Sequence, residues 1–281
     1  MPITNLEFVT THTYAYPPHE PRDPLGQTAM TMCKRNGDPC LAFLTQTGYE
    51  DEVVYLQFFE DTEIHRHDTP VDWEVIAGMG YNPLTQKIWC GNVTNDKHKV
   101  MSFDPNTGLE VTSQDLSADD TLIVGADGFG TNGFVYTRTG ANRIELRSMN
   151  GMLMGSKEYT SGLRGITHSP WSWIAVNNYE HKMSVLNLFG DVIAECDGVG
   201  VDPSTLAPGE DAGGMMAIAY DYVTDVDTAP QEWLPGGVLG APGTINHPDT
   251  PWSPVPWVRR HRIYVANNSD RTIYAGYFTE A

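Results

Sequence analysis

Apolar and polar residues alternate in short runs along this chain, and turn residues separate one run from the next. The clearest stretch is residues 76–115, where Asn-Pro, Asn-Asp and Asn-Thr-Gly divide four such runs. Alternation with a period of two residues, bounded by Asn, Gly and Pro, is typical of β-strands joined by tight turns. The pattern therefore predicts four consecutive strands in this stretch.

The same order of strands and turns recurs elsewhere in the chain. Four strands are also indicated in residues 28–68, 122–159 and 163–197. The C-terminal residues 261–280 read as a second and a third strand, and we expect residues 214–221 to supply the first strand of that copy. A degenerate repeat of roughly 40 to 50 residues that reads as four strands indicates a β-propeller. The predicted fold is therefore all-β, a single β-propeller domain over residues 1–281.

The number of blades depends on one long interval near the C-terminus. The last two of the predicted second strands are nearly twice as far apart as the others, which begin in turn at Leu41, Ile88, Phe134, Trp173 and Ile263. The interval holds either a sixth blade or an insertion over residues 223–260 within the last blade. Seven prolines lie in these residues, and proline cannot donate a hydrogen bond to a neighbouring strand. This favours the insertion, and with it five blades, over six.

Closure of the ring is expected to involve the N-terminus. The last copy ends after its third strand, which leaves an edge that must be covered or paired. Residues 5–13 read as a strand. We therefore expect this N-terminal strand to lie beside the last strand of the chain and to close the ring.

Three segments resemble a known type of repeat: residues 88–108, 173–190 and 263–278. In each, a strand precedes a turn rich in polar residues, and the first segment ends in the Asp-Pro-Asn-Thr-Gly turn of residues 104–108. These features resemble the NHL and YVTN type of propeller repeat. The resemblance implies a propeller fold, but it covers binding scaffolds as well as lactone and sugar-lactone hydrolases, so it implies no single activity. The metal-binding roles known in the gluconolactonase-like members match this chain only loosely and are not assigned to Glu20, Asn92, Asn177 and Asp221.

The charge balance bears on the partners that the protein can bind. Acidic residues outnumber basic ones by 36 to 17, and the formal net charge is -19. Such a charge repels phosphate backbones and anionic lipid surfaces, so nucleic acid and membranes are not expected as partners. The N-terminus shows no basic segment followed by a long apolar one, and no apolar run has the length to span a bilayer. We expect a soluble protein made in the cytoplasm without a signal peptide.

Cysteine and histidine patterns give weak signals for metal binding. None of the four cysteines has the paired spacing of a structural zinc site. Cys33 and Cys40 flank a predicted turn and can face each other across a hairpin, and the sequence leaves their oxidation open. His65 and His67 lie on one face of a predicted strand, a spacing that a metal could use, although two histidines there are more often ordinary surface residues.

The predicted insertion and its border hold the remaining candidates. Asp221, Asp225 and Asp227 are closely spaced, and calcium prefers carboxylate oxygens, so they are the predicted metal site, with a solvated acidic loop as the alternative. Large aromatic side chains on a backbone stiffened by proline bind partners at low ordering cost. The predicted binding residues are therefore Trp233, Trp252 and Trp257, which could alternatively attach the insertion to the propeller.

Local signatures of the common enzyme classes are absent from the sequence, among them GxSxG, the P-loop, the dinucleotide fingerprint and HExxH. We therefore predict a non-catalytic interaction or structural module, with another protein or further copies of the chain as its partner. A component of a virion, in a tail or on a capsid, is one such role. The alternative is a metal-dependent sugar or lactone hydrolase, in which carboxylates such as Asp127, Asp211 and Asp221 converge at one end of the channel.

Overall fold

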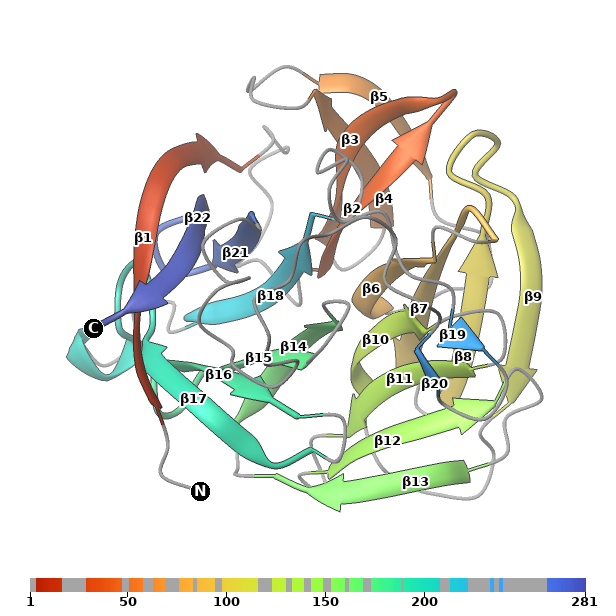
Figure 1. Cartoon of the computed structure of the whole chain (residues 1–281). Helices are drawn as coiled ribbons and strands as arrows, with labels where there is room; N and C mark the ends of the chain where they lie inside the picture. The colour runs from red at the N-terminus through yellow and green to blue at the C-terminus, as the bar shows by residue number, and fades with distance from the viewer. Residues whose placement is uncertain are drawn as a thin grey trace.

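The computed structural model is all-β, and most of its neighbouring strands pair antiparallel (Figure 1). Besides strands, the described residues contain one short 3₁₀ helix, η1 (Pro203–Thr205). The structure describes residues 4–16, 29–46, 51–57, 63–68, 76–82, 85–93, 98–115, 123–129, 133–138, 143–148, 153–159, 162–168, 173–187, 190–207, 213–221, 233–234, 238–239 and 262–281.

Each blade contains four strands, and neighbouring strands within a blade run antiparallel. The first blade contains β2 (Ala29–Arg35), β3 (Asp38–Gln46), β4 (Asp51–Gln57) and β5 (Glu63–Asp68). The second contains β6 (Ile76–Asn82), β7 (Lys87–Val93), β8 (His98–Phe103) and β9 (Glu110–Asp115). The third contains β10 (Ile123–Phe129), β11 (Gly133–Arg138), β12 (Arg143–Ser148) and β13 (Leu153–Glu158). The fourth contains β14 (Leu163–His168), β15 (Trp173–Asn177), β16 (Lys182–Leu186) and β17 (Val192–Asp197). The closing blade contains β18 (Met215–Tyr220), β21 (Ile263–Asn267), β22 (Thr272–Glu280) and β1 (Thr4–Ala15).

The first strands of the blades form the centre of the molecule. They contact one another in the closed cycle β2, β6, β10, β14, β18 and back to β2, and they surround the middle of the view in Figure 1. This is the arrangement of a β-propeller, as predicted. The described strands form five blades. The number in the whole chain stays a prediction, because residues 222–232 and 240–261 lie outside the described residues.

Two buried threonines connect neighbouring first strands. A first strand has a strand partner on one side only, so some of its N–H groups need another acceptor. The Tyr81 N–H in β6 donates to Thr31 Oγ1 of β2 (3.0 Å), and the Tyr220 N–H in β18 donates to Thr167 Oγ1 of β14 (3.3 Å). The two threonines therefore join pairs of blades at the core of the ring.

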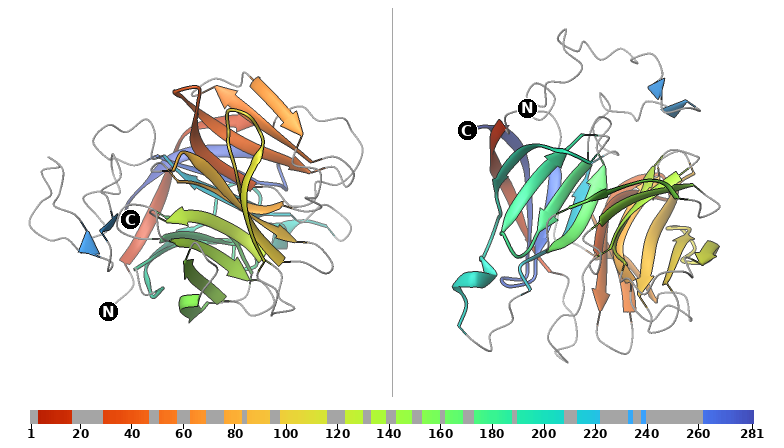
Figure 2. Two further views of the ribbon diagram at one scale, coloured as in Figure 1. Left: turned by 90° about the vertical axis from the view of Figure 1, so that its right-hand side faces the viewer. Right: turned by 90° about the horizontal axis from the view of Figure 1, so that it is seen from below.

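The N-terminal strand closes the ring, as the sequence predicts. β1 pairs antiparallel with β22 from Leu6↔Glu280 to Ala15↔Thr272, with an irregularity between Thr10 and His12. It also makes two parallel bridges to β17, Thr4↔Ala194 and Asn5↔Glu195, which the sequence did not predict. The fourth and closing blades are therefore joined in one eight-stranded sheet, and Figure 2 shows β1 alongside β22 in two further views.

The predicted insertion falls between β18 and β21. These two strands are direct neighbours, with Tyr220 opposite Ile263, and the Asp221 N–H donates to the Arg262 carbonyl (3.0 Å). Between them, the short strands β19 (Trp233–Leu234) and β20 (Val238–Leu239) pair with each other. The rest of residues 223–260 lies outside the described residues.

The four cysteines are buried and form no disulfide. Cys33 and Cys40 are directly opposite each other across the β2–β3 hairpin, as expected, with their Sγ atoms 3.5 Å apart. All four cysteines are free and buried. The pair is therefore a packed part of the core between the first two blades.

Replacing Leu6 by Ala tests the role of β1 in closure. Leu6 is 6% exposed and lies in the buried cluster of the fourth and closing blades, so truncation leaves a cavity and should cost about 3 kcal/mol of unfolding free energy. Glu7, the exposed neighbour on the same strand, provides the control, because Glu7→Ala should change stability by less than about 0.5 kcal/mol. Denaturant unfolding measures both, and equal small effects would show that β1 does not support the core.

Candidate functional site

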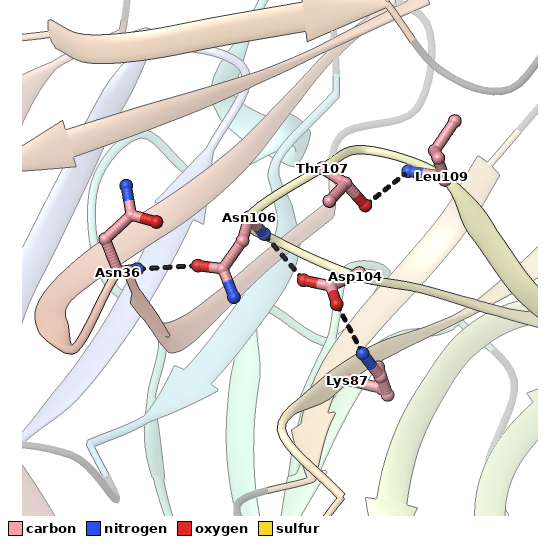
Figure 3. Close-up of polar contacts among 6 residues, drawn as sticks. All are labelled: Asn36, Lys87, Asp104, Asn106, Thr107 and Leu109. Atoms are coloured by element: carbon pink, nitrogen blue, oxygen red, sulfur yellow. Dashed lines mark hydrogen bonds and ion pairs between the residues drawn. The ribbon is translucent and has the colours of Figure 1, made fainter.

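A polar network joins the first two blades at their turns (Figure 3). Asp104 begins the turn between β8 and β9 and accepts hydrogen bonds from Lys87 Nζ and from the Asn106 N–H. The side chain of Asn106 reaches the first blade, where its Oδ1 accepts from the Asn36 N–H (2.6 Å). Although partial burial opposes it, the hydrogen bond from Lys87 holds the pKa of Asp104 below its usual range. The carboxylate is therefore charged and fixes the turn.

The turn ends in Gly108, which packs directly against His67 of β5. Gly108 has a φ of 72°, in the left-handed region that favours glycine. A Cβ at this position would lie 2.9 Å from His67 Nδ1. The His67 ring also meets the edge of Phe103, with ring centroids 5.8 Å apart. The Asp104–Gly108 turn, which carries the resemblance to propeller repeats, thus holds a histidine of the preceding blade in place.

Both ring nitrogens of His67 are engaged. Nδ1 is 2.8 Å from the Asp68 carbonyl oxygen, which can only accept, so Nδ1 carries the proton and donates. Nε2 then accepts from the hydroxyl of Tyr55 on β4 (2.9 Å). Burial lowers the pKa of His67 and raises the pKa of Tyr55, so both groups are neutral near pH 7. The pair is a fixed support beneath the surface, since Tyr55 is fully buried.

Arg35 and His65 lie against this support. The Arg35 guanidinium carbon lies over the Tyr55 ring, 5.5 Å from its centroid, a geometry that favours a cation. The His65 ring centroid is 5.9 Å from that of Tyr55 and 6.0 Å from that of His67. Burial and the nearby charge of Arg35 lower the pKa of His65. We call Arg35, Tyr55, His65 and His67 the rim cluster.

In the rim cluster the two histidines do not both offer a ring nitrogen to a metal. The two histidines do share a face of β5, as predicted, since they stand opposite Tyr55 and Val53. However, His67 has no nitrogen left for a metal. Within the described part of the chain, no three His, Cys, Asp or Glu side chains are grouped as metal ligands.

The predicted calcium ligands are only partly within the described residues. Asp221 is 1% exposed at the end of β18, and its Oδ2 is 4.0 Å from Arg262 Nη1. A guanidinium therefore supplies charge compensation there. Asp225 and Asp227 lie outside the described residues, so the calcium site stays a prediction.

The predicted tryptophan anchors are also untested. Trp233 is the first residue of β19, but its side chain is outside the description, as are Trp252 and Trp257. The residues predicted from the sequence did not include Arg35, although its position one residue before the Asn-Gly turn is visible there.

Comparison with known proteins supports the fold. No family model and no curated protein matches the sequence. The structure is similar to glutaminyl cyclase from Myxococcus xanthus, with a TM-score of 0.62 and 10% identity over 100% of both chains. A protein of unknown function from Bacteroides caccae gives a TM-score of 0.45 at 9% identity, over 65% of this chain and 63% of that one. BamB from Moraxella catarrhalis gives 0.39 at 9% identity, over 89% and 57%.

At 10% identity, the likeness to the Myxococcus enzyme shows the fold alone. The TM-scores of the other two fall below 0.5, and only the first supports the fold. No helix within the described residues has the length and apolar character needed to cross a membrane.

Replacing Gly108 by Ala tests the packing of the turn on His67. The new Cβ would meet the imidazole and would also sit at a positive φ, so the loss of unfolding free energy should be about 2 to 3 kcal/mol. Gly37 has a φ of 92° but nothing within 4 Å of its Cβ position, so Gly37→Ala isolates the backbone cost of about 1 kcal/mol. Equal losses in the two variants, measured by denaturant unfolding, would contradict the contact.

The pKa of His67 predicts a pH dependence of stability. Because the folded protein lowers this pKa below its ordinary value of 6.5, the unfolded chain binds the proton more readily. The contribution of His67 is therefore complete above pH 6.5 and is lost as the pH falls through the folded pKa. Thermal melts from pH 8 to pH 5 should show that the stability advantage of wild type over His67→Gln shrinks with acid. An advantage that is constant or grows towards low pH would contradict the assignment.

Proposed function

We propose that this chain is a non-catalytic β-propeller that acts as an interaction module and binds a protein partner through the rim cluster. The main support for this proposal is that Arg35 has no ion pair within the described residues. It is partly exposed, and its buried Nε has no hydrogen-bond partner. Within the described residues Arg35 makes no ion pair, although acidic residues outnumber basic ones twofold in the chain. The buried Nε is out of a partner's reach, so a partner would place its acceptor against the exposed part of this side chain.

The surroundings of Arg35 have the composition of an interface centre. Arginine and tyrosine are enriched among the side chains that dominate binding energy, especially where a rigid support holds them. Leu109, which directly follows Gly108, is 69% exposed and is drawn in Figure 3. A polar anchor, Arg35, and an exposed apolar side chain, Leu109, are therefore available on neighbouring turns of the first two blades.

The geometry of the cluster favours binding over catalysis. Tyr55 and His67 form the kind of hydrogen-bonded pair that could activate a hydroxyl. Tyr55, however, is 0% exposed, so a substrate has no access to its oxygen. The second candidate function is an enzyme, because the structure is similar to a glutaminyl cyclase over the full length of both chains. The metal-dependent sugar or lactone hydrolase predicted from the sequence as the alternative is also an enzyme.

Two elements of the prediction extend this proposal. Trp233, Trp252 and Trp257 are proposed as a second contact surface, and Asp221, Asp225 and Asp227 as a calcium site that steadies the base of the same segment. The role of a virion component, in a tail or on a capsid, is the biological setting that we proposed from the sequence.

An array of end-blocked peptides of mixed composition tests the module. The wild-type protein should retain a subset of peptides, and Arg35→Ala should weaken that retention at least tenfold while the melting profile stays cooperative. Lys157→Ala is the control, because Lys157 is an exposed cation that is already paired with Asp191. Glutaminyl cyclase and lactonase assays are run on the same samples. Turnover in either assay, or retention that survives Arg35→Ala, would overturn the proposal.

A further inference from the structure

Basic side chains in the described residues are commonly paired with carboxylates. Six such ion pairs are formed by Arg66 with Glu63, Lys87 with Asp104, Arg143 with Glu145, Lys157 with Asp191, Lys182 with Glu195 and Arg262 with Asp221. Arg35 has Asp38 directly opposite it across the hairpin, yet no ion pair joins the two among the described contacts. Two other carboxylates of the first two blades are occupied by lysine or arginine, Glu63 by Arg66 and Asp104 by Lys87.

The donors of the rim cluster point to an acceptor from outside the chain. Arg35 is permanently charged, offers five N–H donors and accepts none. His65 is partly exposed and forms no hydrogen bond within the described structure. Both lie against the Tyr55–His67 pair, whose hydrogen bonds hold it fixed. The cluster therefore presents a guanidinium and an imidazole on a prepared support.

We propose that the rim cluster is a carboxylate-binding site that recognises an acidic side chain of a peptide partner, with Arg35 as the principal ligand. This deepens the proposed function and rests on it. A guanidinium matches the two oxygens of a carboxylate in a bidentate geometry.

The negative charge of the protein favours a carboxylate over a phosphate as the ligand of the rim cluster. Asp38 lies opposite Arg35 across the hairpin, Asp68 follows His67, and the chain has a net charge of -19, so a doubly charged phosphate is repelled more strongly than a singly charged carboxylate. A small free carboxylate also gains nothing from the exposed Leu109. A peptide with one acidic side chain offers a negative charge to Arg35 and apolar groups to the exposed Leu109.

A matched pair of peptides tests the site. The probes are the end-blocked peptide Gly-Ser-Leu-Asp-Leu-Ser-Gly and its counterpart with Asn in place of Asp, titrated into the full-length protein and followed by calorimetry. The Asp peptide should bind at least tenfold more tightly than the Asn peptide. Arg35→Ala should abolish this preference, and Arg35→Lys, which keeps the charge and loses the fork, should retain part of it.

Arg164→Ala is the matched control. Arg164 also lies over a tyrosine, 5.6 Å from the Tyr179 ring centroid, and its Nε likewise has no hydrogen-bond partner. Tyr179, however, is 67% exposed, and no ring contact joins it to a histidine of the described residues. The preference for Asp should persist in this variant. Competition with acetate and with inorganic phosphate separates the anions, and acetate should displace the Asp peptide at a lower concentration.

The outcomes separate the two proposals. If both peptides bind equally and both are lost in Arg35→Ala, the interaction module stands and the carboxylate site is wrong. If phosphate competes better than acetate, or if Arg35→Ala keeps the preference for Asp, the carboxylate site is also wrong. If neither peptide binds, this inference fails, whereas the module fails only if the peptide array is negative as well.

Discussion

The pairing of β1 with β22 is the interaction on which the rest of the structure depends. Each blade of a propeller buries its faces against two neighbours, so a ring with a gap exposes apolar faces and strand edges together. β1 comes from the opposite end of the chain and occupies the outermost place of the closing blade. Its two bridges to β17 also tie that blade to the fourth. The two ends of the chain therefore hold each other, and the order of the first strands around the centre follows from this closure.

Packing between the first two blades positions the rim cluster. The first two blades share a buried cluster that includes Tyr55, Tyr81 and Phe103. Above this cluster, Asn106 links the β8–β9 turn to Asn36 in the preceding blade. Gly108 then comes close enough to His67 to hold its ring. The four residues of the rim cluster thus come from three strands of the first blade, and the second blade holds His67 in place.

The acidic surface gives the rim cluster its selectivity. A protein with this charge repels most anions at long range, so an anion reaches Arg35 only when short-range contacts compensate. The exposed Leu109, which follows Gly108, offers such a contact to a peptide and not to a free ion. The net charge also favours solubility, and Arg35, which has no ion pair within the described residues, is the proposed point of recognition.

The sequence by itself determined the strands, because the signals involved are local. Alternation with a period of two residues and turns such as Asn-Gly at Asn36 act within a few residues, and the predicted second strands at Trp173 and Ile263 begin where β15 and β21 begin. The facing of Cys33 and Cys40 and the shared face of His65 and His67 follow from the same periodicity. The unpaired edge of the last copy likewise indicated where β1 would go.

Only the tertiary structure decided the bridges from β1 to β17 and the make-up of the rim cluster. Arg35, Tyr55 and His67 stand on three different strands, and Gly108 comes from the next blade, so no spacing along the chain encodes their contact. Whether a histidine is free or engaged depends on which hydroxyl and which carbonyl the ring closure brings within hydrogen-bond distance. Whether an arginine is paired depends on where the carboxylates of neighbouring strands point. These are distances in space between residues far apart in sequence, and they are set by packing rather than by local pattern.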